Sequence, residues 1–594
     1  MLNISMLSPG AIKLNGVVDY YVDFVVNLHL KDRSVWDKFV KVFVDRADSE
    51  DCGWRGEYWG KMMRGACTCY YYTQDYELYN VLTYAVENLL NAQDEYGRIS
   101  SFSIKREFRY WDTWCRKYVI TGLLHYYDIC TNQNLKARII DALRKHIDYI
   151  ISKLGREEGK VDITLTSEVF GGVNSCSILE TIINFYNRTK EQKYLDFAEY
   201  IISTGGSANG SLIDAVNDKT LIPSKYPVQK AYEMISFFEG LLEYYKISGD
   251  TKYLDTVLNF IDAIQKNEIT VIGCAGCYSE DFNNARYTQT EKVELPTQET
   301  CVTVTWMRLL AKAFLITGNA KYIESFEISS LNALYGSVNV NKLQLKRKVT
   351  FVDVGVFAFD SYSPLIDDVR NKGMAGLRDF ADGGVYGCCA CIGSVAVALV
   401  PLMTVLKDGD SAYVNAYYEG KFSVDENLSF TIQGNYPVDD SVLITITNAC
   451  EKERTIKLRV PTWCDDFVVK TGGVIKDLGE YKSVSKVWKK GDVIEVQIKK
   501  GIKAFVVNGY TSYSYGPIVL ARDDKKEQVA GNLSCVNFDL DKATFNRVPE
   551  KAQEMVRFEV YAENEKIILT DYASCGKLWN EENKLSVWFR KAQR

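Results

Sequence analysis

The chain has 594 residues, of which 47% are hydrophobic and 25% charged, and this composition excludes a disordered or fibrous protein. The net charge is −6, so no basic surface indicates a nucleic acid or an anionic membrane as a partner. The three histidines are too few for a histidine-rich metal site, so any metal must be bound by thiolates and carboxylates.

Sixteen cysteines in so long a chain do not indicate a disulfide scaffold, because a chain of this length can build a large core. The N-terminal residues 1–9 (MLNISMLSP) lack the basic start and the long apolar stretch of a signal peptide. We therefore expect reduced thiols and a cytoplasmic location.

In chain order, residues 1–15 are expected to add a strand to a β-sandwich, and residues 16–405 are expected to be helical. A repeat runs through the helical region: residues 245–254 (YKISGDTKYL) echo residues 186–195 (YNRTKEQKYL), with further copies at 315–323, around 127–135 and around 73–78. Equivalent Leu or Tyr residues stand at 135, 194, 253 and 322, which gives steps of 59, 59 and 69 residues.

Each copy reads as the turn of a helical hairpin. A helix ends at Gly or a polar residue, Asp or Asn caps the next helix, and Tyr-Leu begins its apolar face. Such a hairpin cannot bury its apolar stripe alone, so neighbouring hairpins must stack. Five or six hairpins that close on themselves predict an (α/α)6 toroid with a cleft at one end, and an open solenoid is the alternative.

The run from 388 to 406 has no charged residue and resembles a membrane span. It opens with Cys-Cys-Ala-Cys and contains Pro401, and no second span accompanies it. We therefore expect a buried helix of the toroid and no membrane partner.

After residue 406 the pattern changes to alternating apolar and polar residues, as in 441–448 (SVLITITN) and 455–460 (TIKLRV). This alternation is typical of half-buried strands. We predict a β-sandwich over 406–510, followed by a second sandwich or an extension of the first over 511–594. The fold class is therefore mainly α with β.

Reactive side chains concentrate in three segments: 273–282, which holds Cys274 and Cys277, 299–301, and 387–391. A carboxylate and three thiolates in the last two segments offer a tetrahedral zinc site; they are Glu299, Cys301, Cys388 and Cys389. Cys274-x-x-Cys277 is the more conventional zinc half-site, and Cys391 can join it. Buried cysteines that act as small hydrophobic residues are the remaining explanation.

Glu299-Thr-Cys301 with the helix and turn that follow it, together with the later Cys-Cys pair, resembles glycoside hydrolase family 127, the β-L-arabinofuranosidases and their relatives. Segments in the expected order along nearly the whole chain support the resemblance: 114–118 (WCRKY), 230–234 (KAYEM), 359–365 (FDSYSPL), 460–464 (VPTWC), 488–492 (WKKGD) and 515–521 (YGPIVLA).

The resemblance implies a zinc-dependent retaining glycosidase with a cysteine nucleophile. By motif, the four residues Glu299, Cys301, Cys388 and Cys389 resemble the family's zinc ligands, and Cys388 also resembles its nucleophile. Glu280 stands where the family has its acid/base glutamate. The spacing of 19 residues from Glu280 to Glu299 is longer than expected, so Asp281 is an alternative.

The predicted substrate-binding residues surround this centre; they are Lys117, Tyr118, Asn174, Ser175, Lys230, Glu233 and Tyr362. The arabinofuranosidase branch of the family has histidines where this chain has Tyr118, Ser175 and Lys230. A lysine in place of a neutral imidazole favours an acidic or differently substituted glycan.

The sequence thus predicts a retaining exo-glycosidase of the β-L-arabinofuranosidase type that acts on plant or bacterial glycan sugars with bound Zn²⁺. The alternative is a non-catalytic carbohydrate-binding or scaffold protein derived from such an enzyme. The expected partner is a glycoside or oligosaccharide, and a homodimer is possible.

Overall fold

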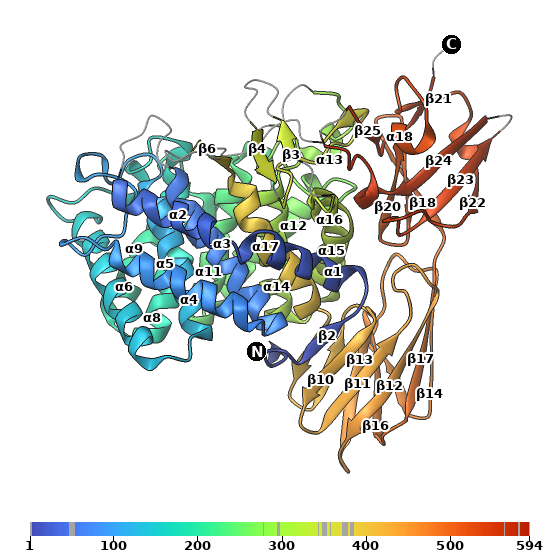
Figure 1. The fold of residues 1–594 in the computed structure, drawn as a ribbon, viewed down its shortest axis with the longest axis horizontal. Helices are drawn as coiled ribbons and strands as arrows, with labels where there is room; N and C mark the ends of the chain where they lie inside the picture. The colour runs from blue at the N-terminus through green and yellow to red at the C-terminus, as the bar shows by residue number, and fades with distance from the viewer. Residues whose placement is uncertain are drawn as a thin grey trace.

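A computed structural model describes residues 3–46, 54–276, 278, 280–293, 297–341, 344–346, 353–356, 358–370, 378–379, 385–562, 565–579 and 582–592. The helices gather in one large domain, and β-sheets form two smaller bodies beside it (Figure 1). The fold is thus mainly α with β, as the sequence predicted.

The helical domain of the described chain is a ring of six inner helices surrounded by outer helices. The inner helices are α3 (Tyr58–Thr73), α5 (Asp112–Ile129), α8 (Leu179–Thr189), α11 (Ala231–Ser248), α14 (Thr300–Thr317) and α17 (Cys388–Leu402). The outer helices are α4 (Tyr76–Asn91), α6 (Gln133–Lys153), α9 (Gln192–Ser203), α12 (Thr251–Asn267) and α15 (Ala320–Ser329), with α1 (Val17–Val25) and α2 (Arg33–Asp45) preceding them. Shorter helices are α7 (Val173–Cys176), α10 (Leu212–Asn217), α13 (Ala285–Thr288), α16 (Tyr335–Ser337) and α18 (Asp524–Glu527).

The ring of inner helices is closed, because α17 packs against both α14 and α3. Each remaining inner helix contacts the next one in chain order. This closure establishes the (α/α)6 toroid and excludes the open solenoid.

The repeated turns show why the hairpins form. α11 ends at Gly249 in the left-handed conformation (φ 67°), and the Asp250 side chain accepts the backbone N–H of Lys252 at the start of α12. The α14–α15 turn uses Gly318 (φ 68°) and Asn319 in the same way.

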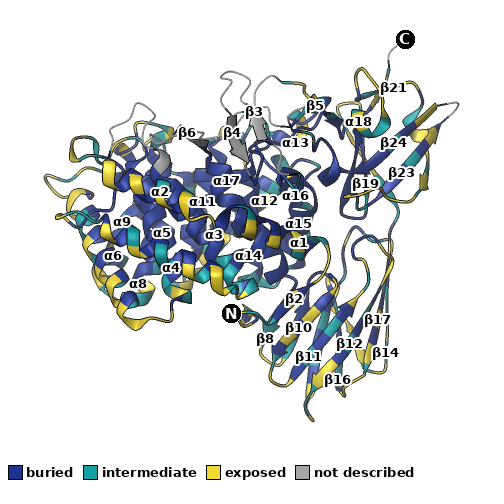
Figure 2. Cartoon of the chain, in the orientation of Figure 1, coloured by how far each residue is buried: buried dark blue, intermediate teal, exposed yellow. Residues whose placement is uncertain are grey.

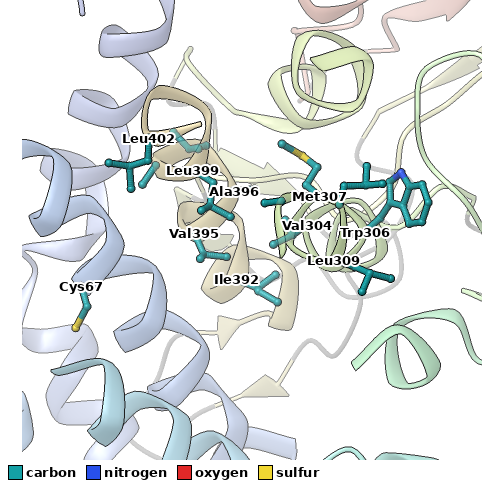
Figure 3. Close-up of a cluster of buried hydrophobic side chains, with 14 of the residues drawn as sticks. Cys67, Val304, Trp306, Met307, Leu309, Ile392, Val395, Ala396, Leu399 and Leu402 are labelled. Carbon is teal, nitrogen blue, oxygen red and sulfur yellow. The ribbon is translucent and has the colours of Figure 1, made fainter. Parts of the chain in front are cut away.

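The inner helices are buried nearly all round, whereas the outer helices expose one face (Figure 2). The buried core includes Val304 and Met307 on α14 and Ile392, Val395 and Leu399 on α17 (Figure 3). Among the described helices, α14 is long and apolar enough to cross a membrane by length and composition, but 78% of its apolar window is buried inside the toroid, as expected of a core helix.

Two six-stranded sheets form the body next to the toroid. The first has the order β1 (Ile4–Met6), β8 (Val405–Asp408), β9 (Ser411–Val414), β13 (Glu453–Arg459), β16 (Tyr481–Val487), β15 (Val474–Asp477). The second has the order β14 (Asp466–Thr471), β17 (Val493–Lys499), β12 (Ser441–Ala449), β11 (Leu428–Gln433), β10 (Gly420–Asp425), β2 (Ile12–Leu14). The first residues of the chain thus contribute one edge strand to each sheet.

A third sheet lies closest to the C-terminus. Its main path is β18 (Ile502–Val507), β19 (Tyr510–Tyr515), β20 (Ile518–Asp523), β24 (Glu565–Asp571), β23 (Arg557–Ala562), β22 (Thr544–Arg547), and β25 (Lys584–Ser586) joins β20 to β5 (Asp368–Val369). Three two-stranded pairs complete the described strands: β3 (Gln344–Lys346) with β4 (Asp353–Val356), β6 (Arg378–Asp379) with β7 (Val385–Tyr386), and β21 (Cys535–Val536) with β26 (Arg590–Lys591). The sequence placed the start of this region at residue 511, whereas its first strand starts at Ile502.

The third sheet supports a toroid loop that reaches the candidate site. The Leu365 carbonyl accepts the N–H of Val587 at 2.9 Å, and the Tyr572 hydroxyl donates to the Pro364 carbonyl at 2.9 Å. These bonds attach Pro364 and Leu365, which follow Tyr362 closely in the chain, to the C-terminal body.

Candidate functional site

Two inner helices begin at the same point of the ring, and four candidate ligands lie there. Glu299 is the N-cap residue of α14, Cys301 lies in the first turn of that helix, and Cys388 and Cys389 open α17. Their ligand atoms all lie within 4.8 Å of one another. Among the residues that the structure describes, this is the one such group of three or more His, Cys, Asp or Glu side chains.

The separations suit a tetrahedral ion. The sulfur atom of Cys301 lies 3.7 Å from that of Cys388 and 3.2 Å from that of Cys389. The sulfur atoms of Cys388 and Cys389 are 3.9 Å apart. Oε1 of Glu299 lies 3.5 Å from the Cys389 sulfur and 4.0 Å from that of Cys388. Zn–S bonds of 2.3 Å and a Zn–O bond of about 2.0 Å require about 3.8 Å between sulfurs and about 3.5 Å between oxygen and sulfur.

Electrostatics favour a cation among these groups. Burial raises the pKa values of Glu299, Cys301 and Cys389 well above their ordinary values, and their negative neighbours raise them further. The pKa of Cys388 is instead lowered, chiefly because the Cys301 and Cys389 thiols donate to its sulfur. A positive ion held by the four groups would offset the cost of ionising them in this buried position.

The alternative half-site is not part of this group. Cys274 is buried, and its thiol donates to the carbonyls of Ala275 at 3.1 Å and Glu299 at 3.5 Å. Cys277 lies outside the described residues. Cys391 is buried one turn into α17 and does not belong to the four-residue group.

Glu280 lies beside the four ligands. The Tyr362 hydroxyl donates to its Oε1 at 2.8 Å, and the Lys230 ammonium donates to its Oε2. The backbone of Tyr362 pairs with that of Glu299, while its hydroxyl bonds Glu280. Tyr362 therefore contacts both the metal-ligand candidate Glu299 and Glu280. Glu280 has a left-handed φ of 73°, a strained conformation for a residue with a side chain and one that is common at functional sites.

Asp281, the alternative to Glu280, follows it in the chain but makes different contacts. Its backbone pairs with Lys230 and with Tyr278. Burial raises the pKa of its carboxyl. The structure places the Glu280 carboxylate, rather than that of Asp281, on the Tyr362 hydroxyl.

Glu233 lies in the first turn of α11, whose N-cap residue is Lys230. It is 3% exposed, and its Oε2 has no hydrogen-bond partner among the residues that the structure describes. Burial raises the pKa of Glu233 to about 7, against the pull of Lys230. A buried carboxyl with a raised pKa therefore lies near Glu280.

The other predicted substrate-binding residues are buried with partners in the protein. The Tyr118 and Tyr232 hydroxyls are hydrogen-bonded, and Lys117 donates to the Ser177 hydroxyl at 3.1 Å. Asn174 donates to the Tyr110 carbonyl at 3.1 Å.

The Ser175 hydroxyl accepts a hydrogen bond from the Thr166 hydroxyl at 2.8 Å. Its contact with substrate, like those of the other predicted binding residues, stays a prediction.

The sequence reasoning missed one buried pair at the start of the first inner helix. Lys61 donates to Glu57 at 3.0 Å, and its ammonium lies 4.7 Å from the ring centre of Tyr232 and 5.2 Å from that of Tyr118. The charge of Lys61 contributes to the low pKa of Cys388.

Residues 22–349 match the profile of the catalytic domain of β-L-arabinofuranosidases, and residues 411–500 match the profile of their middle domain. The class is therefore that of a glycoside hydrolase. More narrowly, the chain belongs to glycoside hydrolase family 127, as the motifs had indicated.

Solved structures agree with this assignment at the level of the fold. A family 127 β-arabinofuranosidase is 18% identical with a TM-score of 0.75, covering 100% of this chain and 98% of that one. A family 127 β-L-arabinofuranosidase from Geobacillus stearothermophilus T6 is 16% identical with a TM-score of 0.73, covering 98% and 100%. No curated protein sequence that was compared matches this chain.

Proposed function

We propose that this glycoside hydrolase is a zinc-dependent, retaining exo-glycosidase that releases β-L-arabinofuranose. The observation that carries the proposal is the group of three thiols and one carboxylate at the starts of α14 and α17, with Glu280 beside it. Glu299, Cys301, Cys388 and Cys389 would hold the ion. When bound, zinc keeps thiolates deprotonated at neutral pH.

Cys388 is the proposed nucleophile. It is 7% exposed, whereas Cys301 and Cys389 are fully buried, so Cys388 is the most accessible of the three cysteines. Its thiolate would attack the anomeric carbon, and the bond to the leaving oxygen would break as the carbon–sulfur bond forms.

Glu280 is the proposed acid/base residue. It would protonate the leaving oxygen in the first step and take a proton from water in the second, as in other retaining glycosidases. Tyr362 and Lys230 hold the two carboxylate oxygens in place. Burial, together with the charge of Glu280 when it is ionised, raises the pKa of Tyr362, so its hydroxyl keeps its proton.

The contacts of Lys230 help to decide whether the preferred sugar is neutral or acidic. Lys230 is 9% exposed and its ammonium already pairs with Glu280, so its charge has a partner without an acidic substituent on the glycan. This pairing favours a neutral pentose over the acidic glycan that the sequence also suggested. The cytoplasmic location and the homodimer stay predictions.

A panel of aryl glycosides tests the proposal. We expect turnover of the β-L-arabinofuranoside by the zinc-loaded protein, retention of anomeric configuration, and no turnover by Cys388→Ser. Cys274→Ser is the matched control and should retain activity. Stoichiometric zinc with no turnover of any sugar would instead support a non-catalytic binding protein, and near-native activity of Cys388→Ser would exclude a cysteine nucleophile.

A further inference from the structure

Two loops next to Lys230 have unusual backbone conformations. We call residues 103–111 the first rim loop and residues 165–172 the second rim loop. Phe108 and Tyr110 in the first have φ values of 55° and 51°, and Glu168 and Phe170 in the second have values of 63° and 51°. Side-chain-bearing residues adopt this region rarely, and they do so where surrounding contacts fix them, often at ligand sites.

Specific bonds fix both loops. Arg109 pairs with Glu168 at 2.7 Å and so joins the two rim loops. Asn174 donates to the Tyr110 carbonyl at 3.1 Å, and the Gly171 carbonyl accepts the N–H of Ala208 at 2.8 Å. These contacts tie the two loops to each other and to the segments that hold Asn174 and Ala208.

That arrangement is a series of aromatic rings from the surface to the buried centre. Phe170 is 36% exposed and lies 6.2 Å from the Trp111 ring, which is 9% exposed. Trp111 lies 5.7 Å from the buried Trp114, whose ring is 5.1 Å from Tyr118 and 5.2 Å from Tyr232. Phe170 is the outermost ring of this series.

Phe170 also lies beside the proposed acid/base residue. The Lys230 ammonium, which donates to Glu280, is 5.2 Å from the centre of the Phe170 ring. Exposure rises outward, from the buried thiols through the Lys230–Glu280 pair to Phe170. An acid that protonates the glycosidic oxygen stands on the leaving-group side of the scissile bond, so that side faces Phe170.

We propose that Phe170 forms the leaving-group subsite, where the carbohydrate ring that departs packs its apolar C–H face on the aromatic ring. This inference rests on the proposed role of Glu280 as acid. Aromatic rings supply large, rigid apolar contact area, and the fixed backbone of the second rim loop keeps the ring in place. Phe170 is thus a specificity-determining residue that touches only the part of the substrate that leaves.

Two substrates with the same sugar and different leaving groups test this assignment. A 4-nitrophenyl glycoside has a ring that reaches Phe170, whereas the glycosyl fluoride has one atom. Phe170→Ala and the size-preserving Phe170→Leu should lower kcat/KM for the aryl glycoside about 5- to 30-fold, the loss expected for one stacked ring. Both should leave kcat/KM for the fluoride within about twofold of the wild-type value, and Phe170→Tyr should restore the aryl activity.

Tyr96→Ala is the control, because Tyr96 is 54% exposed and has no part in the site. It should change neither substrate. Equal losses on both substrates, or no loss on the aryl glycoside, would overturn the assignment of Phe170. If the wild-type protein hydrolyses a sugar other than L-arabinofuranose, the proposed sugar is wrong, and the same pair of leaving groups on that sugar decides the role of Phe170.

Discussion

Removing one thiolate that is not the nucleophile is the most informative change to the metal group. Cys389 is fully buried, and its sulfur lies 3.2 Å from that of Cys301 and 3.5 Å from Oε1 of Glu299. Apparent binding free energies of protein zinc sites with four ligands are about 10–16 kcal/mol. One ligand of four then contributes roughly 2.5–4 kcal/mol, or about 10²- to 10³-fold in Kd.

We therefore expect Cys389→Ser to bind zinc about 10²- to 10³-fold more weakly than the wild-type protein. The measurement is metal content after dialysis against a series of chelator concentrations. Cys274→Ser is the matched control, since Cys274 is equally buried and contacts the backbone of Glu299 without joining the group. Unchanged affinity in Cys389→Ser, or an equal loss in Cys274→Ser, would refute the ligand assignment.

Three further changes have defined outcomes. Glu280→Gln should lower kcat/KM about 10²- to 10⁴-fold for alkyl leaving groups and much less for 4-nitrophenolate, which needs no proton, and equal losses on both would remove Glu280 from the acid role. Burial lowers the pKa of Lys117 to about 7, so between about pH 7 and 10.5 the unfolded chain binds a proton that the folded one does not, and stability rises with pH. Lys117→Met should raise the free energy of unfolding by about 4 kcal/mol at pH 7 and by little near pH 10.5 in denaturant titrations, whereas a gain independent of pH would contradict this sign. Arg308→Met leaves the carboxylates of Glu180 and Glu239 without their shared guanidinium, and should lower the free energy of unfolding by about 3–5 kcal/mol; a loss below about 1 kcal/mol would show that the ion pairs contribute little.

The fold was largely readable from the sequence because its signals are local. The Gly249–Asp250 and Gly318–Asn319 turns each contain the residues that end one helix and cap the next, and four or more copies predict stacked hairpins. Ring closure was not local, since it depends on the contact of α17 with α3, far apart in the chain. The sequence therefore left the solenoid open as an alternative.

The site, too, contains residues that the sequence identified and residues that it did not. Glu299, Cys301 and the Cys388–Cys389 pair were identified because reactive residues at helix starts follow a recognisable family pattern. Lys61 was not, because a lysine in a helix is ordinarily exposed, and only tertiary packing buries it against aromatic rings.

The partners of predicted residues were also beyond the sequence. Nothing in the chain order indicates that Lys230 pairs with Glu280, or that Phe170 lies over the ammonium of Lys230. Both contacts join loops that are distant in sequence, so they follow from the ring geometry and not from any motif.

The most direct test of the central claim is the identity of the residue that carries the sugar during turnover. The Glu280→Gln variant should form the glycosyl-enzyme from 4-nitrophenyl β-L-arabinofuranoside faster than it hydrolyses it, because only the second step needs a base. Acid quenching, proteolysis and fragment mass spectrometry then locate the adduct. We predict one pentose residue on the sulfur of Cys388, whereas a pentose on a carboxylate such as Glu233, or on Cys389, would contradict the account.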